Sequence, residues 1–459
     1  MLAPGTRLAR EYTWLTGLAL GAMLVFLIRW FTLPGRWDDP VLFLLATLIV
    51  IYYLGVWTAR WAALRRMARP LPLSPQPGIR VAVGTSFVPE SEPLAMLQIT
   101  LRALVGMDYP HDTWVLDEGD DPEVRALCER LGARHYSRRN DLRYQAPSGS
   151  FATATKYGNY NAWLTDHVYG AYDCVVTFDP DHVPERSYLT QLLGYFRDPG
   201  IGYVQAPPVF YNQTSSFIAR GAAEESYTYY SSHQMASYAL GHPILVGSHS
   251  AHRVAALRQV GGFPAHDAED LYLTMLYRAA GWRGVYVPRI LALGTTPVDW
   301  TGYLRQQARW ARSVLDLKLR ALPALSKNLS RLERLLNLFH GVYFLRPLVM
   351  FVLVLMLLKM LLENEVPVFL SAWELPAAAA LIAILQLIDR FRQRFFFDPK
   401  RERGFHWRAV VLQLAKWPHL VWALLDAVRN RKLGYVLTRK TGPGRVERIL
   451  TPPHLGIAF

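Results

Sequence analysis

The chain has 459 residues, more than one ordinary domain needs, and 51% of them are hydrophobic, a high share for a soluble enzyme. Its formal net charge of +14 admits a nucleic-acid partner. The basic residues gather beside long apolar segments instead, so we expect a membrane and no nucleic acid. The two cysteines, Cys128 and Cys174, do not suggest a disulfide framework, and Cys174 lies in a strand pattern as a buried apolar residue would.

Two apolar segments near the N-terminus carry no charged residue. They run from Tyr12 to Ile28 and from Pro40 to Ala59, and each is close to the ~20 residues that cross a bilayer. A signal peptide is the competing interpretation of the first. No small-residue cleavage site follows it, and the second apolar segment comes soon after. We therefore predict a transmembrane hairpin over residues 1–70.

Residues 71–315 have the pattern of a globular domain, in which charges, turns and short apolar runs alternate. The expected strands are Ile79–Val83, Thr113–Leu116, Ala133–Tyr136 and Val175–Phe178, and the helices between them are Pro93–Val105 and Pro122–Leu131. This alternation predicts a doubly wound α/β sheet with mostly parallel strands. Ligands of such sheets bind beyond the carboxyl ends of the strands, where Asp117 and Asp179 lie.

The stretch FDPDH places Asp179 and Asp181 one residue apart at the end of an apolar strand. A hard cation such as Mg²⁺ takes oxygen ligands and completes its shell with substrate phosphates. The pattern is common by chance, and a solvated loop or a helix cap is the alternative.

The apolar pattern returns from Leu335 to Leu362 and from Val366 to Ile388. We predict interface helices over 316–336 and transmembrane helices over 337–390. A last apolar stretch, Ala409–Val428, contains Lys416, Pro418, His419 and Asp426, and is either another span or an amphipathic helix at the membrane surface.

Basic clusters flank the apolar segments at 60–69, 390–403 and 429–432. Because positive residues stay on the cytoplasmic side of a membrane, this distribution places the central domain there. If residues 409–428 crossed the membrane, the basic cluster at 429–432 would emerge on the side opposite the cytoplasm. We therefore predict an interfacial helix and a cytoplasmic tail over 391–459.

Six motifs in chain order resemble the membrane-embedded family 2 glycosyltransferases, the cellulose synthase and hyaluronan synthase group. The resemblance covers roughly Val81–Leu315 and a short element near the C-terminus. The motifs are WVLDEGD (Asp117), TKYGNYNAW (Lys156, Gly158, Asn159, Asn161), FDPDH (Asp179, Asp181), VQAPPVFYN (Gln205, Pro207, Asn212), DAEDLYLTMLYRAAGW (Asp270) and QQARW (Gln306, Arg309, Trp310). One such match is weak, but six in order between apolar segments are specific.

Two positions depart from the family pattern. Ala268 stands where the family has the threonine of T-E-D, and Glu269 and Asp270 remain. In GSHSAHR, His249 takes the place of an asparagine. This histidine either alters donor or acceptor recognition or repacks a polar wall of the site.

The resemblance implies a GT-A (Rossmann-like) α/β domain, inserted between transmembrane helices, that binds a UDP-sugar with Mg²⁺ or Mn²⁺. The donor would be bound by Asp117, Glu118, Lys156, Asp179 and Arg309, and by Thr438 and Lys440 of a gating-loop-like YVLTRK; the metal would be bound by Asp179 and Asp181. Simpler alternatives are a turn-forming acid at Asp117, a solvated lysine at Lys156 and a lipid-binding basic tail at YVLTRK.

The same resemblance assigns Asp270 as the catalytic base, which takes the proton of the attacking acceptor hydroxyl. An acid favoured by the helix dipole is the alternative, since Asp270 opens a helix expected over Leu271–Ala280. The acceptor would be bound by Trp310, Gln306 and Glu269. An interfacial anchor is the alternative for Trp310.

We therefore expect an inverting UDP-sugar-dependent enzyme of the inner (plasma) membrane. A processive synthase of a β-linked polysaccharide is favoured, cellulose-like glucan first, with a growing glycan or a lipid as acceptor and a possible partner subunit or second copy. A lipid glycosyltransferase that adds one sugar is the first alternative. A non-catalytic transporter or sugar-binding membrane protein is the second.

Overall fold

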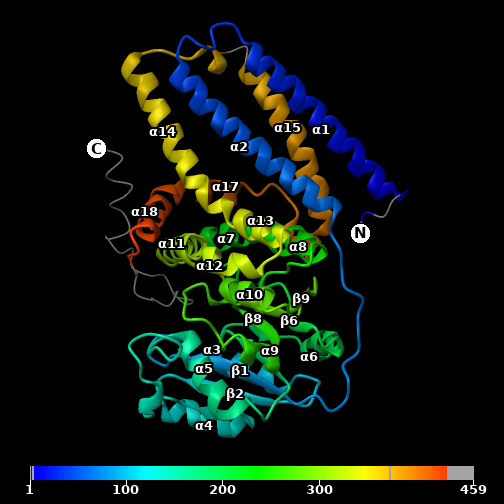
Figure 1. Cartoon of the computed structure of the whole chain (residues 1–459), viewed down its shortest axis with the longest axis vertical. Helices are drawn as coiled ribbons and strands as arrows, with labels where there is room; N and C mark the ends of the chain where they lie inside the picture. The colour runs from blue at the N-terminus through cyan, green and yellow to red at the C-terminus, as the bar shows by residue number, and fades with distance from the viewer. Residues whose placement is uncertain (1, 3–4, 372–373, 432–459) are drawn as a thin grey trace.

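The computed structural model describes residue 2, residues 5–371 and residues 374–431. A bundle of long helices stands at one end of the molecule and an α/β domain at the other, with a layer of shorter helices between them (Figure 1). The bundle contains α1 (Arg7–Thr32), α2 (Pro40–Arg65), α14 (Arg346–Glu363) and α15 (Leu375–Arg392). Residues 66–80 connect the bundle to the first strand of the domain.

The N-terminal hairpin forms as two helices with ordinary caps. The hydroxyl of Thr6 accepts from the backbone of α1, and the carboxylate of Asp39 accepts from Leu42 N at 2.9 Å, with Pro40 in the first turn of α2. By length and composition, three helices among the described residues can cross a membrane: α1, α2 and the helical run Arg331–Glu363. Both apolar segments of the expected hairpin are therefore long apolar helices.

The third apolar run is not one straight helix. It is interrupted at Gly341, whose φ of +80° favours glycine, so that α13 (Arg331–Phe339) and a 3₁₀ turn (Val342–Leu345) precede α14. The stretch expected to enter the membrane at Leu335 therefore begins with a helix that lies below the bundle (Figure 1), and the bundle helix itself begins at Arg346.

The fourth expected span, Val366–Ile388, corresponds mainly to α15, which lies beside α1 (Figure 1). Its last turn carries Asp389, Arg390 and Arg392, and it is not one of the three helices above. A membrane span over Val366–Ile388 therefore stays a prediction.

A seven-stranded sheet forms the centre of the α/β domain, in the order β3-β2-β1-β4-β8-β6-β9. Its strands are β1 (Val81–Phe87), β2 (Asp112–Asp117), β3 (Arg134–Tyr136), β4 (Cys174–Phe178), β6 (Ile201–Gln205), β8 (His249–Arg253) and β9 (Arg283–Tyr286). Every neighbouring pair is parallel except those that β8 makes with β4 and β6. The α/β prediction is confirmed, with β8 as the antiparallel strand that makes the sheet mixed.

The two faces of the sheet carry two separate cores. Val81 and Val83 pack on one face and Ala82 on the other, as the two-residue period of a strand requires. The helices that cover the sheet include α3 (Leu94–Val105), α4 (Pro122–Leu131), α5 (Lys156–Trp163), α9 (Val254–Gln259) and α10 (Glu269–Ala279). Cys128 and Cys174 are both buried free thiols.

The intermediate layer connects the domain to the bundle. It contains α7 (Phe217–Thr228), α8 (Gln234–Ala239), α11 (Trp300–Asp316), α13, α17 (Trp407–Ala415) and α18 (Trp417–Val428). The apolar stretch 409–428 is thus divided at Lys416 into helices of 9 and 12 residues, each well short of the ~20 needed to cross a bilayer. Because α18 packs on α11 and α14, this stretch lies against the domain.

Candidate active site

Charged residues from three distant parts of the chain meet at the carboxyl end of β4. Lys156, the first residue of α5, places its Nζ 2.6 Å from Asp179 Oδ1 and 3.7 Å from Glu269 Oε1. The same Nζ donates to the Gly247 carbonyl at 2.5 Å. Burial alone would lower the pKa of Lys156, but the two carboxylates raise it well above its ordinary value. Lys156 is therefore a charged member of an acidic site and not a solvated surface lysine.

A candidate metal site adjoins this lysine. Asp179, Asp181 and His182 each offer a ligand atom, and these atoms lie within 4.8 Å of one another. Asp181 is buried; one of its oxygens accepts from the Thr295 hydroxyl, and the other lies 3.2 Å from His182 Nδ1. The two carboxylates supply the oxygen ligands that Mg²⁺ and Mn²⁺ prefer, and the imidazole is a third donor beside them.

His182 is the residue that sequence reasoning missed at this site. Its only signal is its position directly after the second aspartate of FDPDH. Its Nε2 is buried, has no hydrogen-bond partner among the described residues, and is packed against Gly294, where an added Cβ would lie 2.2 Å away. The ring therefore has little room to turn, and its Nδ1 stays directed at Asp181.

The two acids of the AED motif open α10. Leu271 N donates to Asp270 Oδ1 at 2.7 Å. Ala268, at the N-cap, makes no side-chain cap bond, so the departure from threonine leaves the helix start without that contact. Gly247 lies against the pair: a Cβ there would come within 3.1 Å of Asp270 Oδ2, and its φ is +34°. A glycine at 247 thus lets the β8 loop approach the acids closely.

Burial raises the pKa of both acids of this pair. For Glu269 the nearby Lys156 opposes the rise and Asp270 adds to it. For Asp270 the hydrogen bond from Leu271 and the charge of Lys156 oppose the rise. Because both carboxyls are buried, they hold a proton at a higher pH than solvated acids do.

We expect the acidic limb of the pH–rate profile to lie above the range of an ordinary aspartate. A base accepts a proton only when it is ionised, and the pKa of Asp270 is raised by burial, so the rate falls as pH is lowered through this raised value. The measurement is kcat/KM for the sugar donor across acidic and neutral pH. A limb at the pKa of a solvated aspartate would contradict the assignment.

Asp117 lies at the end of β2 and is fully buried. Its oxygens accept from Gly119 N at 2.8 Å and Asp121 N at 2.6 Å, and the ring of His135 lies 3.0 Å from Oδ2. These are the contacts of a turn-forming acid, the simpler of the two interpretations. A contact with the base of a nucleotide stays a prediction.

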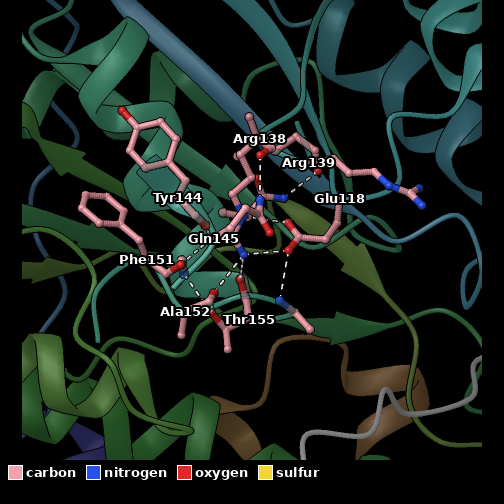
Figure 2. Close-up of polar contacts among 12 residues, drawn as sticks. Glu118, Arg138, Arg139, Tyr144, Gln145, Phe151, Ala152 and Thr155 are labelled. Carbon is pink, nitrogen blue, oxygen red and sulfur yellow. Dashed lines mark hydrogen bonds and ion pairs between the residues drawn. The ribbon is translucent and has the colours of Figure 1, made fainter. Parts of the chain in front are cut away.

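Glu118 is held by an arginine and does not point freely into the site. Its carboxylate accepts from Arg138 Nη2 at 2.6 Å and Nε at 3.1 Å, and from Ala154 N at 3.1 Å. The buried Arg138 guanidinium also donates to the carbonyls of Tyr144, Phe151, Ala152 and Thr155 (Figure 2). This pair thus fixes the segment that leads into Lys156, and a donor contact of Glu118 stays a prediction.

Arg138→Met is expected to lower the free energy of unfolding by about 3–5 kcal/mol, because it removes the charge partner of the Glu118 carboxylate and the donor of several carbonyls. Thermal unfolding of the purified chain in detergent measures this change. Glu118→Gln should cost less, since an amide oxygen still accepts from Arg138. The control is Arg139→Met, one residue along, whose exposed side chain donates to the Gly119 carbonyl. Equal effects at 138 and 139 would contradict this role.

Several motif residues prove to be structural. Asn161 bonds Ser150 O and both backbone groups of Phe263, and Asn159 donates to Leu116 O at 3.0 Å. Gln205 donates to His249 O and accepts from Val246 N, which joins β6 to the loop before β8. Gly158 has no space for a side chain, since a Cβ would lie 2.3 Å from Ala152 O.

His249 packs in the wall beneath the acidic site. Its buried ring stacks on Phe178 and lies 5.4 Å from the ring of His182. Burial lowers its pKa well below the ordinary histidine value, so the ring is neutral. His249 stands where the family has an asparagine. These contacts support the interpretation that the histidine repacks a polar wall of the site.

The QQARW residues lie on α11, whose Val314 packs in one buried cluster with Leu271 of α10. Two contacts join α11 to the segment before α10: an ion pair of Arg312 with Asp267 at 2.9 Å, and a hydrogen bond between the His266 ring and Asp316 at 3.0 Å. Trp310 is 40% exposed. Gln306, Arg309 and Trp310 are thus on a helix fixed beside Asp270, while Thr438 and Lys440 lie outside the described residues.

Residues 174–388 match the family model described as Glycosyl transferase family group 2. Cellulose synthase 1 of Komagataeibacter xylinus is 29% identical over 333 residues, 70% of this chain and 19% of that protein. The cellulose synthase catalytic subunit [UDP-forming] of Pseudomonas fluorescens (strain SBW25) is 26% identical over 414 residues, 86% of this chain and 52% of that protein. Over residues 174–388 the chain is therefore similar to the family 2 glycosyltransferases.

A solved structure supports the expected fold. A mannosyltransferase of Pyrobaculum calidifontis, solved with GDP-Man and Mn²⁺, superposes with a TM-score of 0.55 at 16% identity, over 84% of this chain and 99% of that one. The GT-A prediction is confirmed. The chain spans about half the length, or less, of the cellulose synthases above.

Proposed function

We propose that the protein is an inverting, UDP-sugar-dependent glycosyltransferase that extends a β-linked polysaccharide, with a cellulose-like glucan favoured. The observation that carries this proposal is the meeting of Lys156, Asp179 and Glu269 at one sheet edge. In this proposal a cation, two acids that would bind a metal and the candidate base Asp270, which lines the same pocket as Lys156 and Glu269, act on one small ligand. The relatives named UDP-forming support a uridine donor, whereas the mannosyltransferase supports the fold alone.

The donor half of the site matches a sugar diphosphate. Lys156 is charged and lies at the start of α5, where its ammonium offsets phosphate charge. Asp179, Asp181 and His182 would hold Mg²⁺ or Mn²⁺, which supplies positive charge to the diphosphate as UDP leaves. When donor phosphates enter, they replace part of the Lys156–Asp179 ion pair.

The acceptor half supplies the base. The acceptor hydroxyl oxygen forms a bond to the anomeric carbon as the bond from that carbon to the UDP oxygen breaks on the opposite face. The hydroxyl proton passes to Asp270, whose buried position raises its pKa and so strengthens it as a base. Attack from the face opposite UDP inverts the configuration of that carbon.

Trp310 is the candidate platform for the acceptor sugar. A pyranose ring has an apolar face that stacks on an indole. Trp310 is 40% exposed and follows Arg309 on a helix fixed to the segment before Asp270. We assign Gln306 and Glu269 to the acceptor, and Arg309 to the charge that develops on the leaving UDP.

The proposed location is the inner (plasma) membrane, with several spans and the catalytic domain in the cytoplasm. Long apolar helices and the flanking basic clusters support it. In this arrangement α11, α13, α17 and α18 lie at the membrane surface, so the acceptor, a glycan or a lipid, meets the site next to the bilayer. A second copy or a partner subunit would complete a path for a polymer.

The test uses membranes that carry the full chain, Mg²⁺ or Mn²⁺, and a panel of labelled UDP-sugars with GDP-mannose included. Products are sized and partitioned between water and organic solvent. Long, water-retained material from UDP-glucose supports the proposal. A small organic-soluble product would make it a lipid glycosyltransferase, use of GDP-mannose alone would overturn the uridine donor, and no incorporation would favour a non-catalytic protein.

A further inference from the structure

A buried cluster outside the catalytic site surrounds one ammonium group. Lys416 is 2% exposed, and its Nζ lies 2.8 and 2.9 Å from the two carboxylate oxygens of Glu225. It also lies 2.8 Å from Gln307 Oε1, 2.9 Å from Tyr303 OH and 3.0 Å from Tyr343 OH. We call these five residues the Lys416 cluster.

The Lys416 cluster is balanced in charge and closed in hydrogen bonding. The Tyr303 hydroxyl donates to Glu225 Oε2 at 2.7 Å, and that of Tyr343 donates to Oε1 at 3.3 Å. Burial alone would lower the pKa of Lys416, but Glu225 raises it above the ordinary lysine value. A buried cation with a complete shell holds its partners in one geometry, because any departure leaves a charge unpaired.

The cluster joins separate parts of the structure. Glu225 belongs to α7, Tyr303 and Gln307 to α11, and Tyr343 to the turn before α14, while Lys416 lies between α17 and α18. One side chain therefore connects the helix of the QQARW motif to the helices of the intermediate layer and to the entry of the bundle.

The positions on α11 show what the cluster fixes. At about 3.6 residues per turn, Tyr303 and Gln307 share one stripe of the helix, and Arg312 and Asp316 share another. The first stripe is held by Lys416 and the second by Asp267 and His266. Gln306, Arg309 and Trp310 occupy the sector between these two anchored stripes.

We propose that Lys416 is a positioning residue for the acceptor, which acts by fixing the rotation of α11 and thereby the direction of Trp310. This inference rests on the proposed function of the site. Lys416 touches neither donor nor acceptor. Its removal should impair transfer to a sugar acceptor and spare the attack of water on the donor, which needs no platform.

The test compares Lys416→Met, Glu225→Gln and the double variant in membranes with UDP-glucose. Transfer to cellotetraose and hydrolysis of UDP-glucose by water are measured separately. We expect transfer by Lys416→Met to fall about 10²-fold, the scale of a misplaced reactant, with hydrolysis unchanged. The double variant removes the unpaired carboxylate charge, so it should regain thermal stability and still transfer poorly. A purely structural role predicts that stability and transfer recover together.

The matched control is Arg408→Met. Arg408 pairs with Glu224, the neighbour of Glu225, and so also joins α7 to α17, and no polar contact in the described part of the chain joins it to α11. We expect this variant to transfer as wild type does. Normal transfer by Lys416→Met, or equal losses in both variants, would overturn the inference.

Hydrogen exchange tests whether Lys416 holds α11 in place, even if UDP-glucose is not the donor. In the full chain, Lys416→Met should speed amide exchange in residues 300–316, and Arg408→Met should not. Unchanged exchange there would overturn the inference. A wild type that neither transfers nor hydrolyses UDP-glucose would instead count against the proposed function, and the exchange result would still decide whether Lys416 holds α11.

Discussion

Asp270→Asn is expected to reduce sugar transfer by about 10²- to 10⁴-fold, the usual contribution of a positioned base. The amide has nearly the same shape as the carboxylate but does not accept the acceptor proton. Its oxygen can still accept from Leu271 N, so the start of α10 should be preserved. The measurement is incorporation of labelled sugar by membranes, with UDP binding measured in parallel.

Two comparisons make this result specific. Asp173→Asn is the same chemical change at an exposed acid, where Asp173 pairs with Arg80 at the start of β4, and it should leave transfer unchanged. UDP binding should persist in Asp270→Asn, since the donor is assigned to Lys156 and the metal-binding acids. An Asp270→Asn protein that transfers normally would remove the base assignment and revive the transporter alternative.

The central fold was predictable because its signals are local. The strand expected over Val175–Phe178 is β4, Cys174–Phe178, and the helix expected over Pro122–Leu131 has those bounds in the structure. Apolar runs bounded by turns define such elements without knowledge of their neighbours. Because strand ends meet at one edge of a parallel sheet, the same patterns placed Asp117 and Asp179 near the site.

The residues that hold the site together were not predictable in the same way. Glu118 and Arg138 are 20 residues apart, and Glu225 and Lys416 are 191 apart. Each of these charges alone looks like a solvated residue, and only the tertiary contacts bury it. The resemblance assigns Glu118 to the donor, and that contact stays a prediction; its oxygens contact Arg138 and Ala154, which the sequence did not indicate.

The break in the apolar run near Gly341 was missed for a related reason. The leucines of α13 lie on one side of the helix. Composition does not register this one-sidedness, so the leucines from Leu335 onward merge with the apolar residues of α14 into one long hydrophobic stretch. Ser330 and Glu333 form a capping box at the start of α13, and Arg278 of α10 pairs with Glu333 at 2.6 Å. These contacts hold α13 against the domain, and a single glycine then redirects the chain into α14.

Asp181→Asn is expected to remove the metal dependence of donor binding and to lower transfer by about 10²- to 10³-fold, the scale of one lost electrostatic contact with the leaving group. The amide that replaces the carboxylate can keep the contact with the Thr295 hydroxyl, so the loop should keep its shape while one charged ligand is lost. Binding of UDP is measured as Mn²⁺ is titrated after removal of metal with EDTA. Wild type should regain binding and transfer together as the metal returns.

Asp121→Asn is the matched control for this experiment. Asp121 is an acid at the same edge of the sheet, but it caps α4 by accepting from Glu123 N at 2.7 Å. Asparagine is an equally good cap, so the metal titration should coincide with that of wild type. If Asp181→Asn also titrated as wild type does, Asp181 would be a structural acid held by Thr295, and Asp179 with His182 would have to supply the metal ligands alone.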